Sequence, residues 1–135
     1  MAFKLVVISP VKNVLETEID SVTIPTVDGE ITVLPKHMPI FSMVKSGEVT
    51  VRTKNGVDYL ACGGGFVNVT GDKVTLLLEY GVNSEEIDEE KVREAKRRAE
   101  EILKTQADEK SSAMAQTSLA RSLLELKVAR KRKRG

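Results

Sequence analysis

The sequence predicts an α+β fold, in which an N-terminal antiparallel β-sandwich or flattened barrel is followed by a C-terminal antiparallel two-helix hairpin. Charged residues make up 16 of residues 1–84 but 25 of residues 85–135, so only the first part can bury a large apolar core. Every proline, and every glycine except Gly135, lies at or before Gly81. Because the second part lacks helix breakers until its last residue, we expect a β domain at 1–84 and a helical domain at 85–135.

Three β-hairpins are predicted in the first part. The clearest spans residues 49–61, where apolar and polar side chains alternate on both sides of Asn55-Gly56. Asn-Gly tolerates the positive φ angles that a two-residue turn needs. About eight to ten short strands with no helix between them are typical of a small sandwich or barrel. The other two hairpins are strands 66–69 and 74–78 around Gly71-Asp72, and strands 21–26 and 31–34 around Asp28-Gly29.

Two helices are predicted in the charged part. Asp88 stands at an N-cap position, and apolar residues then recur at intervals of three and four up to Leu103, which gives one narrow apolar stripe. Polar residues at 106–112 interrupt the pattern, and residues 119–128 restore it. Both stripes are rich in alanine, which buries little area at about 25 cal/mol per Å². The hairpin is therefore expected to be marginally stable by itself and able to open.

The residue types argue against catalysis and metal binding. His37 is the only histidine, and no serine, cysteine or carboxylate near it in the sequence completes a triad. Cys62 is the only cysteine, which excludes an internal disulfide and fits a reducing compartment. Residues 63–65 are three glycines, but no Gly-Lys-Ser/Thr follows them, so a bulge or a close backbone approach is expected in place of a phosphate loop. The apolar run 5–8 is too short for a signal peptide or a membrane span.

The C-terminal tail carries five consecutive cations at 130–134. Such a run attracts nucleic acid phosphate, anionic lipid or an acidic protein segment, and it is also typical of a solvated, disordered tail. The helical part contains no aromatic residue, so base stacking has no support. An adaptor that binds nucleic acid or an acidic protein through this tail remains the alternative function, and a small enzyme on a β-sandwich is the third reading.

Four segments of the chain go beyond a simple pattern of apolar and polar residues. They are GEITVLPKHMPIFS at 29–42, GGFVNVTGDKVTLL at 64–77, IDEEKVREAKRRAEEIL at 87–103 and SLARSLLELKVAR at 118–130. In this order they resemble the epsilon subunit of bacterial F-type ATP synthases. Within the first segment, Thr32 and Lys36 replace glycines that are usual in the family.

The resemblance implies a β-sandwich docking domain at the foot of the central stalk, in contact with the gamma subunit and the c-subunit ring. It also implies a helical hairpin that extends toward the alpha and beta subunits of the catalytic head and inhibits ATP hydrolysis. Such a subunit has no catalytic residue, lies peripherally on the cytoplasmic side of the bacterial inner membrane, and meets the membrane only through the complex. No nucleic acid is expected as a partner.

The resemblance also assigns interface residues. Those expected to contact the c ring or gamma are Glu30, Pro35, His37 and Met38. Those expected to make regulatory contacts from the second helix are Arg121, Lys127, Arg130, Lys131 and Arg132.

Some bacterial members bind ATP in the folded hairpin, and this sequence matches their motif in part. The matching or aligned positions are Ile87, Asp88, Arg98 and Arg121, whereas Lys91 and Val92 replace an Arg-Ala pair and Glu125 replaces an arginine. Lysine lacks the planar guanidinium with which arginine binds a phosphate through two N–H groups. The carboxylate of Glu125 would repel phosphate. No cofactor is expected to be required, and these departures argue against regulation by bound ATP.

Overall fold

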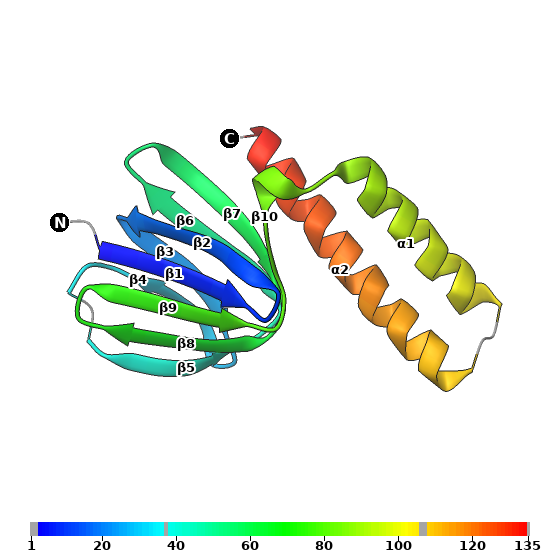
Figure 1. Cartoon of the computed structure of the whole chain (residues 1–135), viewed down its shortest axis with the longest axis horizontal. Coiled ribbons are helices and arrows are strands. Elements are labelled where there is room, and N and C mark those ends of the chain that lie inside the picture. The colour runs from blue at the N-terminus through cyan, green and yellow to red at the C-terminus, as the bar shows by residue number, and fades with distance from the viewer. Residues whose placement is uncertain (1–2, 37, 106–107, 135) are drawn as a thin grey trace.

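Ten strands and two helices make up the structure, a computed structural model that describes residues 3–36, 38–105 and 108–134 (Figure 1). The sequence expectation of an antiparallel sandwich followed by two helices is confirmed. The strands are β1 (Phe3–Ser9), β2 (Lys12–Ile19), β3 (Ser21–Thr26), β4 (Gly29–Val33), β5 (Ile40–Val44), β6 (Gly47–Thr53), β7 (Gly56–Cys62), β8 (Gly65–Thr70), β9 (Lys73–Leu78) and β10 (Gly81–Asn83).

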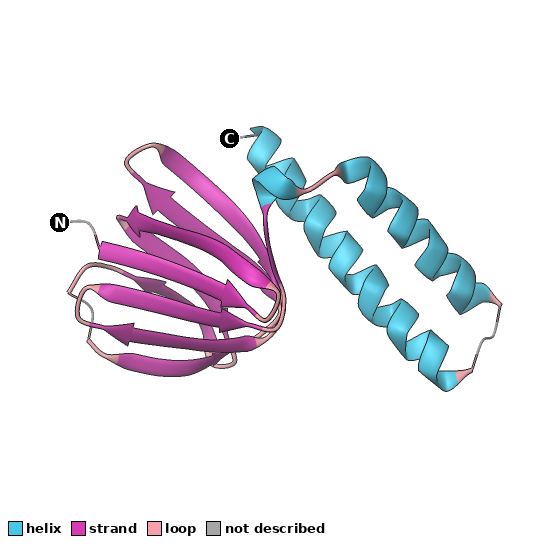
Figure 2. Cartoon of the chain, in the orientation of Figure 1, coloured by secondary structure: helices cyan, strands magenta, loops and turns pink. Residues whose placement is uncertain are grey.

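The strands form one sheet that curls into a nearly closed sandwich (Figure 2). Their order is β10-β7-β6-β3-β5-β8-β9-β1-β2, with β4 added to β3. All neighbours are antiparallel except β1 and β9, which run parallel. A single backbone pair, Thr26 with Val44, joins β3 to β5, so it connects the layer of β10, β7, β6, β3 and β4 to the layer of β5, β8, β9, β1 and β2.

The core lies between these two layers and consists of every second residue of the strands. In β1, for example, Leu5 and Val7 are fully buried whereas Lys4 is exposed. The other fully buried large side chains come from both layers: Ile19, Val22, Ile24, Val33, Val49, Val51, Leu60, Val67, Val69 and Leu76.

All three predicted hairpins are present, but two of their turns begin one residue earlier than expected. Thr53 pairs with Gly56, so Lys54-Asn55 forms the turn of the β6–β7 hairpin. Of Lys54, Asn55 and Gly56, only Gly56 has a positive φ, at +129°. The β3–β4 turn shifts in the same way, with Gly29 at φ +114°. Only in the β8–β9 hairpin does the predicted dipeptide, Gly71-Asp72, form the turn itself.

The close backbone approach expected near residues 63–65 occurs at Gly65. A Cβ atom there would lie 2.0 Å from the carbonyl oxygen of Leu77, closer than any side chain allows. Glycine is therefore required at this position by packing.

A short 3-10 turn, η1 (Ser84–Glu86), leads into α1 (Glu89–Lys104), and α2 (Glu109–Arg134) follows. The predicted N-cap is confirmed, since the Asp88 carboxylate accepts hydrogen bonds from the backbone N–H groups of Glu90 and Lys91. The second helix starts ten residues before the predicted residue 119, because Asp108 caps it by accepting from the Ser111 N–H at 2.8 Å. The expectation of a disordered tail is wrong, because the helix continues to Arg134.

The hairpin stands at one end of the sandwich and touches it through the C-terminal part of α2 (Figure 1). That part packs on β7, β6 and η1, while α1 packs along α2. The residues of α2 that are buried are Ala115, Ser122, Leu126, Val128 and Ala129, and four of these five lie in the half nearer the sandwich.

Candidate functional site

An exposed apolar surface lies on the outer side of β5, β8 and β9, and we call it the apolar face. Met43 pairs with Phe66, and Phe66 pairs with Leu77, so these three side chains form a row across the strands. Phe41 stacks on Phe66 with 5.5 Å between ring centroids. The exposed fractions of Phe41, Met43, Phe66 and Leu77 are 70%, 53%, 42% and 49%. Contiguous exposed apolar side chains of this kind mark interaction sites.

Sequence reasoning missed the apolar face, although a signal for it was present. A strand with one face in water alternates apolar and polar residues, yet Phe66-Val67 and Leu76-Leu77-Leu78 run without a polar residue. Such runs place apolar side chains on both sides of a strand. Only the strand order shows that the outward ones meet.

The loop that joins β4 to β5 adjoins the apolar face at the start of β5. Leu34 and Met38 are 55% and 79% exposed, and Pro35 is half-buried. His37, which was expected to act with them, lies outside the described residues. This loop lies at the end of the sandwich away from the helices (Figure 1).

Glu30, the fourth residue expected in this interface, lies at the opposite end of β4 from Pro35 and Met38. It lines a polar groove on the outer side of β3, β4 and β6, beneath the C-terminal end of α2. The groove is lined by Ser21, Thr23, Pro25, Glu30, Thr32, Glu48, Thr50, Arg52, Lys127 and Lys131.

A chain of hydrogen bonds orders the floor of this polar groove. Arg52 Nη1 donates to Thr23 Oγ1 at 3.2 Å, and the hydroxyls of Thr23 and Thr32 lie 3.0 Å apart. Above them, Lys131 Nζ donates to Glu48 Oε1 at 2.6 Å. The groove therefore joins the basic tail to the sandwich.

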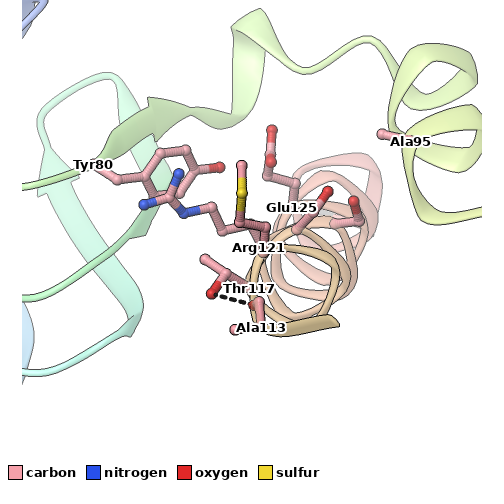
Figure 3. A pocket seen from close by; sticks show the side chains of 9 residues that line it. Tyr80, Ala95, Ala113, Thr117, Arg121 and Glu125 are labelled. Atoms are coloured by element: carbon pink, nitrogen blue, oxygen red, sulfur yellow. Dashed lines mark hydrogen bonds between the residues drawn. The ribbon is translucent and has the colours of Figure 1, made fainter. Parts of the chain in front are cut away.

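A second contact between helix and sandwich lies at Tyr80, where the Arg121 guanidinium covers the phenol ring at 4.5 Å from the centroid (Figure 3). Within the described part of the chain, the Tyr80 hydroxyl has no hydrogen-bond partner. Burial raises the pKa of Tyr80, and the Glu125 carboxylate raises it further. Tyr80 is therefore a neutral ring that a cation can cover.

The residues expected to bind ATP are not gathered in one pocket. Arg121 lines a groove with Tyr80 and Glu125, and Arg98 lines an adjoining groove between α1 and α2. The two grooves share Ala95, Met114 and Ser118. Ile87, Asp88 and Lys91 line neither groove. The Asp88 carboxylate is occupied by the cap of α1.

The five basic residues of α2 that are expected to make regulatory contacts divide into two groups. Arg121, Lys127 and Lys131 face the sandwich or its polar groove. Arg130 and Arg132 are exposed on either side of Lys131. A tail that sequence reasoning treated as uniform thus has one cation docked between two exposed ones.

Other chemical groups offer little to a reaction. Cys62 is fully buried, and burial raises the pKa of its thiol to about 11. Among residues 3–36, 38–105 and 108–134, no group of three or more His, Cys, Asp or Glu is placed to hold a metal ion. In the same part of the chain, no helix has the length and hydropathy to cross a membrane.

Comparison with known families gives matches over nearly the whole chain. Residues 2–83 match the β-sandwich domain of the ATP synthase delta/epsilon chain, and residues 85–130 match its long α-helix domain. The ATP synthase epsilon chain of Geobacter sulfurreducens is 37% identical over 134 residues, covering 97% of each chain. That of Geotalea daltonii is 36% identical over 129 residues, covering 95% of this chain and 94% of the relative.

Solved structures share the fold. A chain in the cryo-EM structure of the Euglena gracilis mitochondrial ATP synthase OSCP/F1/c-ring aligns with a TM-score of 0.61 at 24% identity, covering 93% of this chain and 76% of that one. A chain in the central stalk/c-ring structure of the Tetrahymena thermophila mitochondrial ATP synthase aligns with a TM-score of 0.58 at 16% identity, covering 93% and 95%.

Proposed function

This chain belongs to the ATP synthase delta/epsilon family as a bacterial-type epsilon subunit, and from that premise we propose that it is a non-catalytic subunit of the central stalk. In this role it couples the catalytic head to the c ring and inhibits ATP hydrolysis through its C-terminal helices. The two structural neighbours come from an F1/c-ring assembly and from a central stalk with its c ring, which supports the assignment to the rotor.

The observation that carries the proposal is the apolar face. Phe41, Met43, Phe66 and Leu77 need a partner surface, and in a central stalk the gamma subunit is the partner that we assign to them. Pro35 and Met38 adjoin this face, so we place their loop, to which His37 also belongs, against gamma. Glu30, at the other end of β4, is assigned to the c ring.

The helical hairpin is the proposed inhibitory element, with the alpha and beta subunits of the head as its targets. It contacts the sandwich through α2, from Arg121 toward the C-terminal end, while α1 packs along α2, which favours release of the hairpin as a unit. Regulation by bound ATP is not part of the proposal, because Glu125 lines the same groove as Arg121 and because Lys91 and Val92 replace the Arg-Ala pair of the motif.

Location follows from the assembly. We place the subunit peripherally on the cytoplasmic side of the bacterial inner membrane, with membrane contact only through the complex. Nucleic acid is not a proposed partner, because the helical part that carries the basic tail has no aromatic residue on which bases could stack.

A binding experiment tests the gamma assignment. Phe41→Ala should weaken binding of the full chain to purified gamma by about thirtyfold, since truncation of a central aromatic anchor costs about 2 kcal/mol. Val57→Ala is the control, because Val57 is 46% exposed but lies on β7 in the other layer. Equal affinities of the two variants would rule out the apolar face as the gamma site.

The helices are tested separately by inhibition. The full chain should slow ATP hydrolysis by the isolated catalytic head, whereas a version that ends at Ser84 should bind gamma without slowing hydrolysis. Inhibition by the shortened version would contradict the role given to the helices.

A further inference from the structure

We propose that Lys131 and Glu48 form a latch that holds the helical hairpin against the sandwich. The inference rests on the proposed function, in which the hairpin leaves the sandwich to inhibit. It adds a specific control over that movement, because this ion pair joins the C-terminal end of α2 to the sandwich and is lost when the hairpin leaves.

The geometry of the contact is that of a partly buried ion pair. Lys131 Nζ lies 2.6 Å from Glu48 Oε1 and 5.7 Å from the centroid of the Tyr59 ring. The Glu48 side chain is 12% exposed and that of Lys131 is 45% exposed. By comparison, the ion pair of Lys4 with Glu16 is 3.7 Å long, with both side chains at least half exposed, so it is screened by water.

Glu48 depends on Lys131 more than an ordinary surface carboxylate would. Its second oxygen, Oε2, is buried and has no hydrogen-bond partner among the described residues. With the hairpin docked and Lys131 removed, a nearly buried carboxylate would lack its cation. With the hairpin undocked, the same carboxylate faces water. Loss of Lys131 therefore raises the free energy of the docked state far more than that of the undocked state.

The position of the latch gives it control over the whole contact. Val128 and Ala129, which are three and two residues before Lys131, are 0% and 5% exposed. They occupy the part of α2 that packs on the sandwich and η1. If the end of the helix lifts, these side chains lose their burial, so the latch and the apolar docking act together.

The test measures docking directly in the full chain. Spin labels on cysteines at Lys54, in the β6–β7 turn, and at Lys110, near the start of α2, report the distance between sandwich and hairpin by pulsed EPR. Cys62 is fully buried and can remain. Lys131→Gln should raise the ratio of undocked to docked molecules by about tenfold. Arg132→Gln removes the same charge from an exposed neighbour and should leave the ratio unchanged.

A double variant separates the latch from simple loss of charge. Glu48→Gln removes the buried charge, so Glu48→Gln combined with Lys131→Gln should return the ratio to within about twofold of the original chain. Equal opening in Lys131→Gln and Arg132→Gln would overturn the latch. So would a double variant that opens as far as Lys131→Gln alone.

The experiments can reject the latch and the inhibitory role of the hairpin separately. If Lys131→Gln opens the hairpin but does not change inhibition of ATP hydrolysis, the latch holds and the inhibitory role is wrong. If the full chain inhibits hydrolysis and Lys131→Gln leaves the distance distribution unchanged, the inhibitory role holds and the latch is wrong.

Discussion

At the residue scale, Lys36 has a strained backbone conformation. Its φ of +64° is the only positive φ of a non-glycine residue in the described part of the chain. The left-handed region costs most residues about 1–2 kcal/mol. The sequence comparison had noted Lys36 in place of a family glycine, and the structure gives the reason for glycine there.

Replacing this lysine should therefore stabilise the protein. Lys36→Gly removes the strain but adds freedom to the unfolded chain, so we expect a net increase of about 0.5–1 kcal/mol in the free energy of unfolding, measured by urea denaturation. Lys54→Gly is the control, because Lys54 is an exposed turn lysine without a positive φ. A loss of stability in both variants would show that Lys36 is unstrained.

At the element scale, local chemistry predicted α1 well and α2 poorly. Asp88 and the stripe that follows it were sufficient to place α1. The start of α2 was missed because its first turns carry few large apolar residues, and the capping carboxylate of Asp108 fell inside a segment taken as polar. The hydrogen bonds that Asp108 accepts from Ser111 lower the pKa of that carboxyl.

The cap of α1 can be tested by keeping or removing its acceptor oxygen. Asp88→Ala should lower the free energy of unfolding by about 1 kcal/mol, because two N–H groups of the first turn lose their acceptor. Asp88→Ser keeps an oxygen in reach and should lose far less. Helical circular dichroism during urea unfolding measures both, and equal losses would mean that the cap contributes nothing.

At the scale of the whole molecule, the sequence predicted the fold, but not the surfaces on which function depends. Lys131 and Glu48 are 83 residues apart, and no local pattern connects them. The apolar face depends in the same way on β5, β8 and β9 being neighbours. Periodicity predicts which side chains point outward, but strand order decides which of them meet.

The departures from the ATP-binding motif at Lys91, Val92 and Glu125 also have a whole-molecule consequence. A nucleotide at 100 times its Kd would stabilise the folded chain by about 2.7 kcal/mol, which is several degrees in Tm. We expect millimolar Mg-ATP to leave the Tm of this chain unchanged, measured by calorimetry.

A matched variant provides the control for the nucleotide experiment. Lys91→Arg, Val92→Ala and Glu125→Arg together restore the family pattern, and this variant should show a rise in Tm with Mg-ATP. A rise of the same size in the unaltered chain would mean that it senses ATP despite its substitutions.

The attachment of α2 at one end makes the hairpin a lever. The helix has 26 residues and is about 39 Å long at 1.5 Å per residue, and it contacts the sandwich from Arg121 toward its C-terminus. A tilt of about 10° around Arg121 would move the far end of the hairpin by about 3 Å, since about 12 residues, or about 18 Å, project beyond that contact. Small adjustments among side chains at the attachment are thus converted into displacements large enough for a neighbouring subunit to detect.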